Sequence, residues 1–532
     1  MTTNLLLTAL IIISCLVLNR VSNKLGIPML LAFIVLGMFF GSDGLLKIPF
    51  DNFFMAEELC SIALIFIMFY GGFGTKLSQA RPILVKSVLL STLGVLMTAA
   101  LVGLFCHFVL RFPLFESFLI GSVLSSTDAA SVFSILRSKK LNLKYNTASM
   151  LEVESGSNDP CAYMLTVIIL TLMGGQETQI NLFGLVFAQI FYGVIFGIGI
   201  AYLALWIYKR FEFKESGYTA IFMVAIALTA FALPVQFGGN GYLSVYIVGV
   251  MMGNKRIQGK KALVNFFDGI TGLMQMFLFF LLGLLSYPSQ MLTILAPAIA
   301  IALFLTFVAR PVTIFAILSP FGCELSQKLL VSWSGLRGAA SIVFAVTATI
   351  SPAYTSNDIF HIVFQIVLFS ILFQGSLIPF IARKLNMIDA HEDVMKTFTD
   401  YSDEVPIEFI EFTINETHQW AGKYIREILL PPDTILVLIL RNREELIPRG
   451  NIKLEVEDTL ILSAKSPRKI DGIALYETTV GATHEWRDHK VKDLVKDPAM
   501  LIVHIRRKGR VVIPVGDTVI KSGDVLVMNR RD

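Results

Sequence analysis

Apolar stretches long enough to cross a lipid bilayer follow one another along the chain from its N-terminus to about Leu385. Each stretch needs about 20 residues, because an α-helix rises about 1.5 Å per residue and the hydrocarbon core of a membrane is about 30 Å thick. Of the 532 residues, 55% are hydrophobic and only 16% are charged. These features predict a polytopic α-helical membrane protein, in which residues 5–18 are a retained first span and not a signal peptide.

The hydrophobic segments predict about thirteen spans. They cover residues 4–19, 26–42, 57–74, 83–110, 114–136, 147–174, 179–208, 217–237, 240–253, 264–286, 290–318, 326–350 and 358–382. Loops after odd-numbered spans, counted together with Lys86 and Lys328 at the start of the following spans, carry 17 Lys and Arg residues, whereas loops after even-numbered spans carry only Lys47 and Arg111. Because Lys and Arg gather on the cytoplasmic side, we expect an inner (plasma) membrane protein with its N-terminus outside and its C-terminus in the cytoplasm. Its partners are then membrane lipid and not nucleic acid.

Two spans contain runs of small and polar residues around a central charge, SSTDAAS at 125–131 and GLRGAAS at 335–341. These spans are seven apart, so they cross the membrane in opposite directions. Such an arrangement is typical of the inverted repeats of secondary transporters, whose broken helices cross near the middle of the bilayer. We therefore expect Gly335, Arg337 and Gly338 to lie at such a crossing. The alternative is two independent helices that pack closely through their small residues.

The end of the chain contains an internal repeat. Residues 434–462 and 499–528 align with a constant offset of 66 residues, which places Pro448 over Pro514, Gly450 over Gly516 and Asp458 over Asp524. Both halves alternate apolar and polar residues and turn at P-x-G, so both are predicted to form short β-strands joined by hairpins. The expected organisation is a membrane domain, a linker and a soluble α+β domain in two copies, with boundaries at 1–387, 388–403, 404–470 and 471–532.

Several charged residues lie in segments that are otherwise suited to lipid. A charge at the bilayer centre costs a few kcal/mol or more, so each such residue is a candidate functional residue. The set expected within the membrane is Asp128, Glu154, Asp159, Arg310 and Arg337. Glu152 and Asp268 are placed nearer to helix ends and are interpreted as positional or gating charges.

The segment LEVESGSNDPCAY, residues 151–163, presents two polar faces if it is helical. Glu154 and Asn158 are four residues apart and share one face, whereas Ser155 and Asp159 share another. The face with Ser155 and Asp159 offers hard oxygen ligands, which suit a hard cation.

The face with Glu154 and Asn158 requires a positive charge that belongs to the protein and is not transported. Arg310 or Arg337 can supply it to Glu154. A different interpretation of these charges is a static buried network that only holds helices together. A static network fits Asp159 poorly. If Asp159 were only one half of a structural ion pair, the carboxylate of Asp128 would need a positively charged partner as well.

These motifs resemble those of the monovalent cation/proton antiporters of the sodium/proton exchanger superfamily, in its NhaP-like and cell-volume-regulation branch. The resemblance covers the whole membrane part and rests on STDAAS (126–131), ESGSNDP (154–160), Arg310-Pro311 and GLRGAAS (335–341). It implies alternating access, with no cofactor, in which a potassium or sodium ion competes with a proton. In this family the competition occurs at the aspartate that matches Asp159, and the residues that help to bind the cation match Asn158, Asp128, Thr127 and Ser155.

The resemblance also implies a buried ion pair between Glu154 and Arg310, although Arg337 remains possible. Where relatives carry two adjacent aspartates, the pair can take up a second proton. Asn158 is uncharged, so we expect an electroneutral exchange of one cation for one proton. One departure is Tyr70, which stands where relatives often have a carboxylate before a Gly-Gly pair. This change removes an accessory charge and affects the expected ion preference.

The tail resembles the TrkA-C-like ligand-binding lobes (RCK C-lobes) of potassium-conductance regulators, most clearly at IPRGNIKLEVEDTLIL (447–462) and more weakly in the second copy. No GxGxxG occurs in residues 388–532, so the nucleotide-binding Rossmann half is absent. Such lobes are usually dimeric and sense potassium-related signals. The resemblance therefore implies a homodimer, favours potassium, and makes a nucleotide or cyclic dinucleotide the expected regulator. Direct pH sensing through His484, His489 or His504 is the weaker option.

Other functions fit the sequence less well. A tail-gated potassium channel needs a membrane loop of the TVGYG type, and the only TVG lies at residues 479–481 in the tail. An organic-anion carrier should have cationic and not anionic groups around its broken helices. An enzyme is not expected, because no nucleophile and base occur together.

Overall fold

A computed structural model gives the fold of the chain as two compact units, Met1–Tyr401 and Ser402–Asp532. The residues that the structure describes are 2–25, 29–128, 131–132, 135–136, 141–174, 181–211, 216–255, 257, 260–353, 355–389, 407–416, 418–431, 434–441, 444–465, 475–481, 484–494, 500–507, 510–512 and 514–530. From residue 390 onward, the predicted linker lies outside the described residues.

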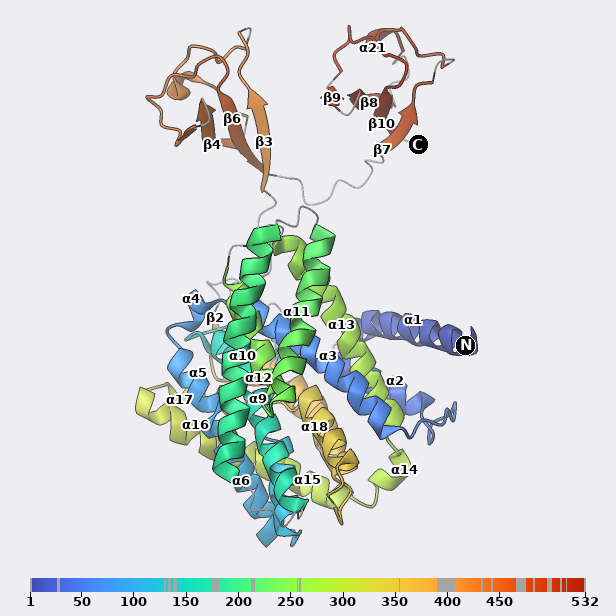
Figure 1. Ribbon diagram of the computed structural model, residues 1–532, viewed down its shortest axis with the longest axis vertical. Coiled ribbons are helices and arrows are strands. Elements are labelled where there is room, and N and C mark those ends of the chain that lie inside the picture. Colours follow the sequence, from blue (N-terminus) through green and yellow to red (C-terminus); the bar gives the residue numbers. More distant parts are fainter. Residues whose placement is uncertain are drawn as a thin grey trace. The chain divides into compact units, whose positions relative to one another are not determined.

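The first unit is a bundle of helices (Figure 1). Each of the thirteen predicted segments contains at least one helix. The helices are α1 (Thr2–Leu25), α2 (Met29–Phe40), α3 (Phe53–Gly74), α4 (Leu77–Ala80), α5 (Leu84–Ser91), α6 (Leu93–Phe108), α7 (Leu114–Val123), α9 (Thr147–Met173), α10 (Leu182–Phe211), α11 (Ser216–Gln236), α12 (Gly241–Gly253), α13 (Lys260–Leu285), α14 (Pro288–Met291), α15 (Leu295–Phe304), α16 (Arg310–Leu318), α17 (Leu325–Trp333), α18 (Ala339–Ile350), α19 (Ile359–Phe369) and α20 (Ser376–Lys384). A two-residue ribbon also pairs β1 (Asn142–Leu143) with β2 (Ile388–Asp389).

Hydropathy confirms that this unit is a membrane domain. Within the described residues, seven helical stretches are long and apolar enough to cross a bilayer, and five shorter apolar helices accompany them. Two long stretches contain a π-helical turn, Leu305–Ala309 between α15 and α16 and Ser370–Gly375 between α19 and α20. Such turns often occur at functional sites, and the first of them ends directly before Arg310.

Glycines bring the helices of the bundle into close contact. A Cβ atom at Gly72 of α3 would lie 2.6 Å from the carbonyl oxygen of Tyr246 of α12, and one at Gly37 of α2 would lie 2.9 Å from the Cα of Gly283 of α13. Real side chains do not tolerate such distances, so only glycine allows these backbones to approach. The contacts fix α3 and α13, which both line the cavity described below.

The second unit contains two four-stranded antiparallel sheets with the same strand order. The first has the order β3-β6-β4-β5 and the second β7-β10-β8-β9. Their strands are β3 (Ile407–Thr413), β4 (Thr434–Arg441), β5 (Glu444–Leu446), β6 (Thr459–Lys465), β7 (Leu475–Thr479), β8 (Met500–Arg507), β9 (Arg510–Val512) and β10 (Val525–Arg530). Helix in the described tail is limited to one 3₁₀ turn, Ile425–Glu427, and to α21 (Val491–Leu494). The predicted repeat is thus a repeat of structure.

Each sheet also carries the same ion pair, in which a partly exposed arginine binds a buried aspartate. The Arg441 guanidinium donates from Nε and Nη2 to the two oxygens of Asp458, both at 2.8 Å. Arg507 does the same to Asp524 at 2.8 and 2.7 Å. Arg507 holds the pKa of Asp524 below its usual value. This pair therefore stabilises the fold above the ordinary carboxyl pKa, and the stabilisation is lost as the pH falls through the lower folded-state pKa.

Candidate functional site

The two interrupted spans meet in the bundle. The helix α7 ends at Val123 and α17 ends at Trp333, and each is followed by a non-helical segment. The backbone N–H of Asp128 donates to the carbonyl of Leu336 at 2.8 Å, which joins the two segments directly. A Cβ atom at Gly338 would collide with the side chain of Asp128, so the close approach requires glycine at this position. The crossing of broken helices is thus as predicted.

Arg337 stabilises this crossing. Its Nη1 donates to the carbonyl of Leu124 and, at 2.7 Å, to that of Ser126, and its backbone N–H donates to Ser370 Oγ at 3.0 Å. The carbonyls at the end of a helix have no partner within the helix and carry partial negative charge. The Arg337 side chain, 1% exposed, supplies both the hydrogen bonds and the compensating positive charge for the broken end of α7.

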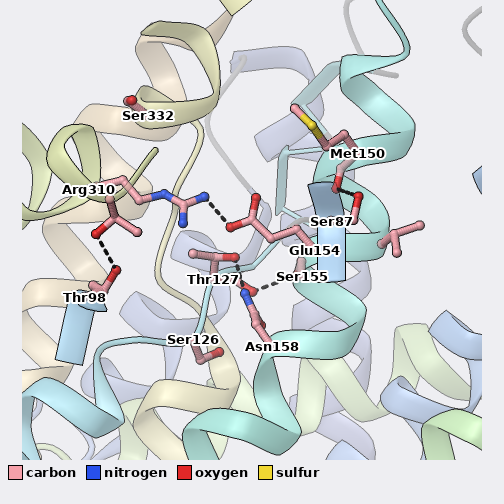
Figure 2. A network of polar contacts seen from close by, with 12 residues as sticks. Ser87, Thr98, Ser126, Thr127, Met150, Glu154, Ser155, Asn158, Arg310 and Ser332 are labelled. Carbon is pink, nitrogen blue, oxygen red and sulfur yellow. Dashed lines mark hydrogen bonds and ion pairs between the residues drawn. The ribbon is translucent and has the colours of Figure 1, made fainter. Parts of the chain in front are cut away.

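Arg310 is paired with Glu154. Arg310 Nη2 lies 2.5 Å from Glu154 Oε1, and the two residues are 3% and 1% exposed. Figure 2 shows the guanidinium reaching from α16 to the carboxylate on α9. Of the two partners left open by the sequence, the structure therefore brings Arg310 to Glu154, while Arg337 serves the end of α7.

The polar face of α9 holds the non-helical segment that follows α7. Ser155 Oγ donates to the carbonyl of Thr127 at 2.7 Å, and Asn158 Nδ2 donates to Thr127 Oγ1 at 2.5 Å (Figure 2). Ser126 Oγ donates to Asp159 Oδ1. Ser126 was not singled out from the sequence, although it lies next to Thr127 in SSTDAAS. These contacts place Asp159 against the unwound backbone.

A cavity of about 440 Å³ opens beside this segment. Four of the five predicted cation-binding residues line it, namely Thr127, Asp128, Ser155 and Asp159. The fifth, Asn158, is not among the lining residues and acts on the site through Thr127. Glu154 and Arg310 are not among them either. The structure thus separates an ion pair buried in protein from carboxylates that line the cavity.

The cavity also collects residues that the sequence placed elsewhere. Glu152 and Asp268, interpreted as positional or gating charges, line it together with Tyr70. Tyr70 Oη donates to Asp268 Oδ1 at 3.3 Å. Four carboxylates therefore share one cavity whose other polar lining is hydroxyl and amide, a donor set of hard oxygens that suits an alkali cation.

Comparison with known proteins now decides the family. A family model described as "Sodium/hydrogen exchanger, transmembrane" matches residues 7–384, and one described as "TrkA-C domain" matches residues 409–468 and 475–528. The chain belongs to the sodium/hydrogen exchanger family. The resemblance that was drawn from the motifs is confirmed for both parts.

Named relatives of this exchanger cover most of its length. It is 34% identical to "K(+)/H(+) antiporter NhaP" of Alkalimonas amylolytica, over 87% of this chain and 81% of the relative. It is 32% identical to "K(+)/H(+) antiporter NhaP2" of Shewanella oneidensis, over 86% and 80% of the two chains. Among solved structures, the sodium proton antiporter MjNhaP1 of Methanocaldococcus jannaschii at pH 8 is similar with a TM-score of 0.62 and 26% identity, over 71% of this chain and 97% of that one.

Proposed function

We propose that this exchanger is an electroneutral secondary antiporter that moves one potassium ion, or sodium ion, against one proton by alternating access. The observation that carries the proposal is the position of Asp159. Its carboxylate lines a cavity together with Asp128, Thr127 and Ser155, and it lies where two broken helices meet. A transported cation at this place has carboxylate, hydroxyl and backbone carbonyl oxygens as ligands.

The carboxylate of Asp159 also couples cation movement to proton movement. A carboxylate in low-dielectric surroundings is costly unless a positive charge neutralises it. At Asp159 this charge is either the cation or a proton, and binding of one displaces the other. The protein can then change conformation with the site neutralised by either ion, and much less readily with the site charged and empty. This restriction produces exchange instead of leak.

We expect one-for-one exchange because the positions beside Asp159 on the polar faces of α9 offer no second exchangeable proton. Asn158, next to the exchange residue, is neutral, and Glu154 is already compensated by Arg310. Only the proton on Asp159 is then released when a monovalent cation binds there. Potassium is favoured because the relatives at 34% and 32% identity are named potassium/proton antiporters, whereas a relative at 27% identity is named a sodium/proton antiporter.

The proposal is tested in proteoliposomes that contain the purified protein and a pH-sensitive dye. We expect potassium, and less effectively sodium or lithium, to dissipate an imposed pH gradient. The initial rate should not change when a membrane potential is imposed at fixed ion gradients, because no net charge moves. Acceleration by the potential would contradict one-for-one exchange. Potassium flux without proton movement would instead identify the tail-gated channel.

We also propose that the tail regulates transport in response to a nucleotide or cyclic dinucleotide. The protein is then a homodimer in the cytoplasmic membrane, with its tail in the cytoplasm. The site lies wholly in the first unit, which is compact by itself. Lys144 N donates to the carbonyl of Met387 at 2.9 Å, and β1 pairs with β2 up to Asp389. A truncation after Asp389 therefore keeps the contacts that close the membrane unit.

We expect the truncated protein to exchange cations at a rate similar to that of the full chain but to lose any response to added nucleotides. The measurement is the pH and nucleotide dependence of exchange in both proteins, reconstituted side by side. Identical profiles would limit the tail to assembly or stability. Loss of exchange in a well-folded truncation would show that the tail is part of the transport machinery.

A further inference from the structure

One helix of the cavity presents polar residues that the exchange mechanism above does not use. Asp268 and Thr271 are three residues apart on α13, so they lie on one face of the helix, and both line the cavity that contains Asp159. Asp268 is largely exposed. Tyr70 of α3, only 7% exposed, donates its hydroxyl to Asp268. Asp268 therefore adds a carboxylate from α13 to the cavity that α9 also lines.

Thr271 has a buried hydroxyl that lacks a partner. The residue is 8% exposed, and its Oγ1 has no hydrogen-bond partner in the described part of the chain. Other threonines on the helices of this unit donate to the carbonyl four residues earlier, for example Thr166, Thr313 and Thr349. Leaving a buried hydroxyl unsatisfied costs about 1–3 kcal/mol. Because Thr271 lines the cavity, a cation or its water can satisfy this hydroxyl there.

The elements that carry these residues are held firmly. The ring of Phe69, next to Tyr70, lies 5.1 Å from that of Phe267, next to Asp268. The glycine contact of α2 with α13 fixes the same helix from its other side. These contacts hold α3 and α13, which carry Tyr70, Asp268 and Thr271, against their neighbours. A fixed set of oxygens selects for an ion better than mobile side chains do.

We infer that Asp268, Tyr70 and Thr271 form a second cation subsite in this cavity, which holds a partly hydrated alkali cation before it reaches Asp159. The inference rests on the proposed function. Asp268 supplies the charge, while the phenol and threonine oxygens supply neutral ligands. Because Asp268 is exposed and not enclosed by protein, the cation keeps part of its water there and is bound weakly enough to move on. Asp128, Glu152 and Asp159 add negative potential that favours cations throughout the cavity.

The alternative is that Tyr70 and Asp268 only join two helices. Transport kinetics separate the two ideas. In proteoliposomes at low ionic strength, we expect Asp268→Asn to raise the KM for potassium about fivefold, as for loss of one nearby charge, with the maximal rate retained. Thr271→Val, which keeps the shape of the side chain, should raise KM in the same direction but less. Asp51→Asn, which removes an exposed charge outside the cavity, is the matched control and should match wild type. An unchanged KM in Asp268→Asn would overturn the inference.

Direct binding gives a second readout that does not depend on transport. With radioactive rubidium and the purified full-length protein, Asp159→Asn should retain weak binding, and the double variant Asp159→Asn, Asp268→Asn should lose it. No binding in Asp159→Asn alone would also overturn the subsite. The proposed function fails differently, since wild type would then show no cation-dependent proton movement at all.

Discussion

We expect that replacing Asp159 by Asn abolishes exchange while the protein still folds. Asparagine has nearly the same shape, and its side-chain oxygen can still accept from Ser126, so the crossing of the broken helices is kept. The negative charge is lost, and with it both the affinity for the cation and the proton that must be exchanged. We expect the rate to fall about a hundredfold or more, the effect of several kcal/mol.

The measurement is potassium-dependent proton movement in proteoliposomes, normalised to the amount of reconstituted protein. Asp51→Asn again serves as the control for loss of a carboxylate, and thermal unfolding in detergent checks that both variants fold. Substantial residual antiport in a folded Asp159→Asn protein would remove this residue from the centre of the mechanism.

The second large effect concerns stability. Removing either partner of the Glu154–Arg310 pair leaves a charge buried without compensation, which costs roughly 3–5 kcal/mol. Glu154→Gln and Arg310→Gln should therefore each lower the thermal unfolding midpoint strongly, and the double variant should recover much of the loss. Arg337→Gln is the matched comparison, because Arg337 bonds the end of α7 and not Glu154. Its combination with Glu154→Gln should recover much less stability than the combination of Glu154→Gln with Arg310→Gln.

The outcome of this double-mutant cycle discriminates between the two arginines. A double Glu154→Gln, Arg310→Gln variant that is no more stable than the worse single variant would show that the two charges do not compensate one another. Recovery in the combination with Arg337 instead would assign the pairing to the other arginine.

Local chemistry made part of this fold predictable. Lipid tolerates few polar residues, so hydrophobic segments could be located, and seven long apolar helical stretches and five shorter helices are found among the described residues. Helical periodicity separated Ser155 and Asp159 from Glu154 and Asn158. The partner of Glu154 could not be fixed in this way. Arg310 and Arg337 are both buried, and the choice depends on the broken end of α7, whose free carbonyls occupy Arg337. That geometry exists only once the two interrupted helices have met.

The cavity was the least predictable feature. Asp268 is far from Asp159 in sequence, and only the packing of α13 against α2 and α3 brings both to one space. The sequence indicates only that Tyr70 replaces an accessory carboxylate of relatives. In the structure, its hydroxyl donates to Asp268, another carboxylate of the same cavity. In the tail, the sequence repeat also contains the ion pairs. Arg441 and Arg507 have the same 66-residue spacing as Asp458 and Asp524, with which they pair.

The most direct test of the account is whether cation and proton compete at one site in the wild-type protein. The KM for potassium is measured across a range of pH, with equal pH on both sides of the membrane and tracer rubidium as the readout. Competition predicts that KM rises as the pH falls, approaching about tenfold per pH unit where the carboxyl is mostly protonated, while the rate of cation exchange at saturating potassium is unchanged. A constant KM with a falling maximal rate would contradict a shared site at Asp159.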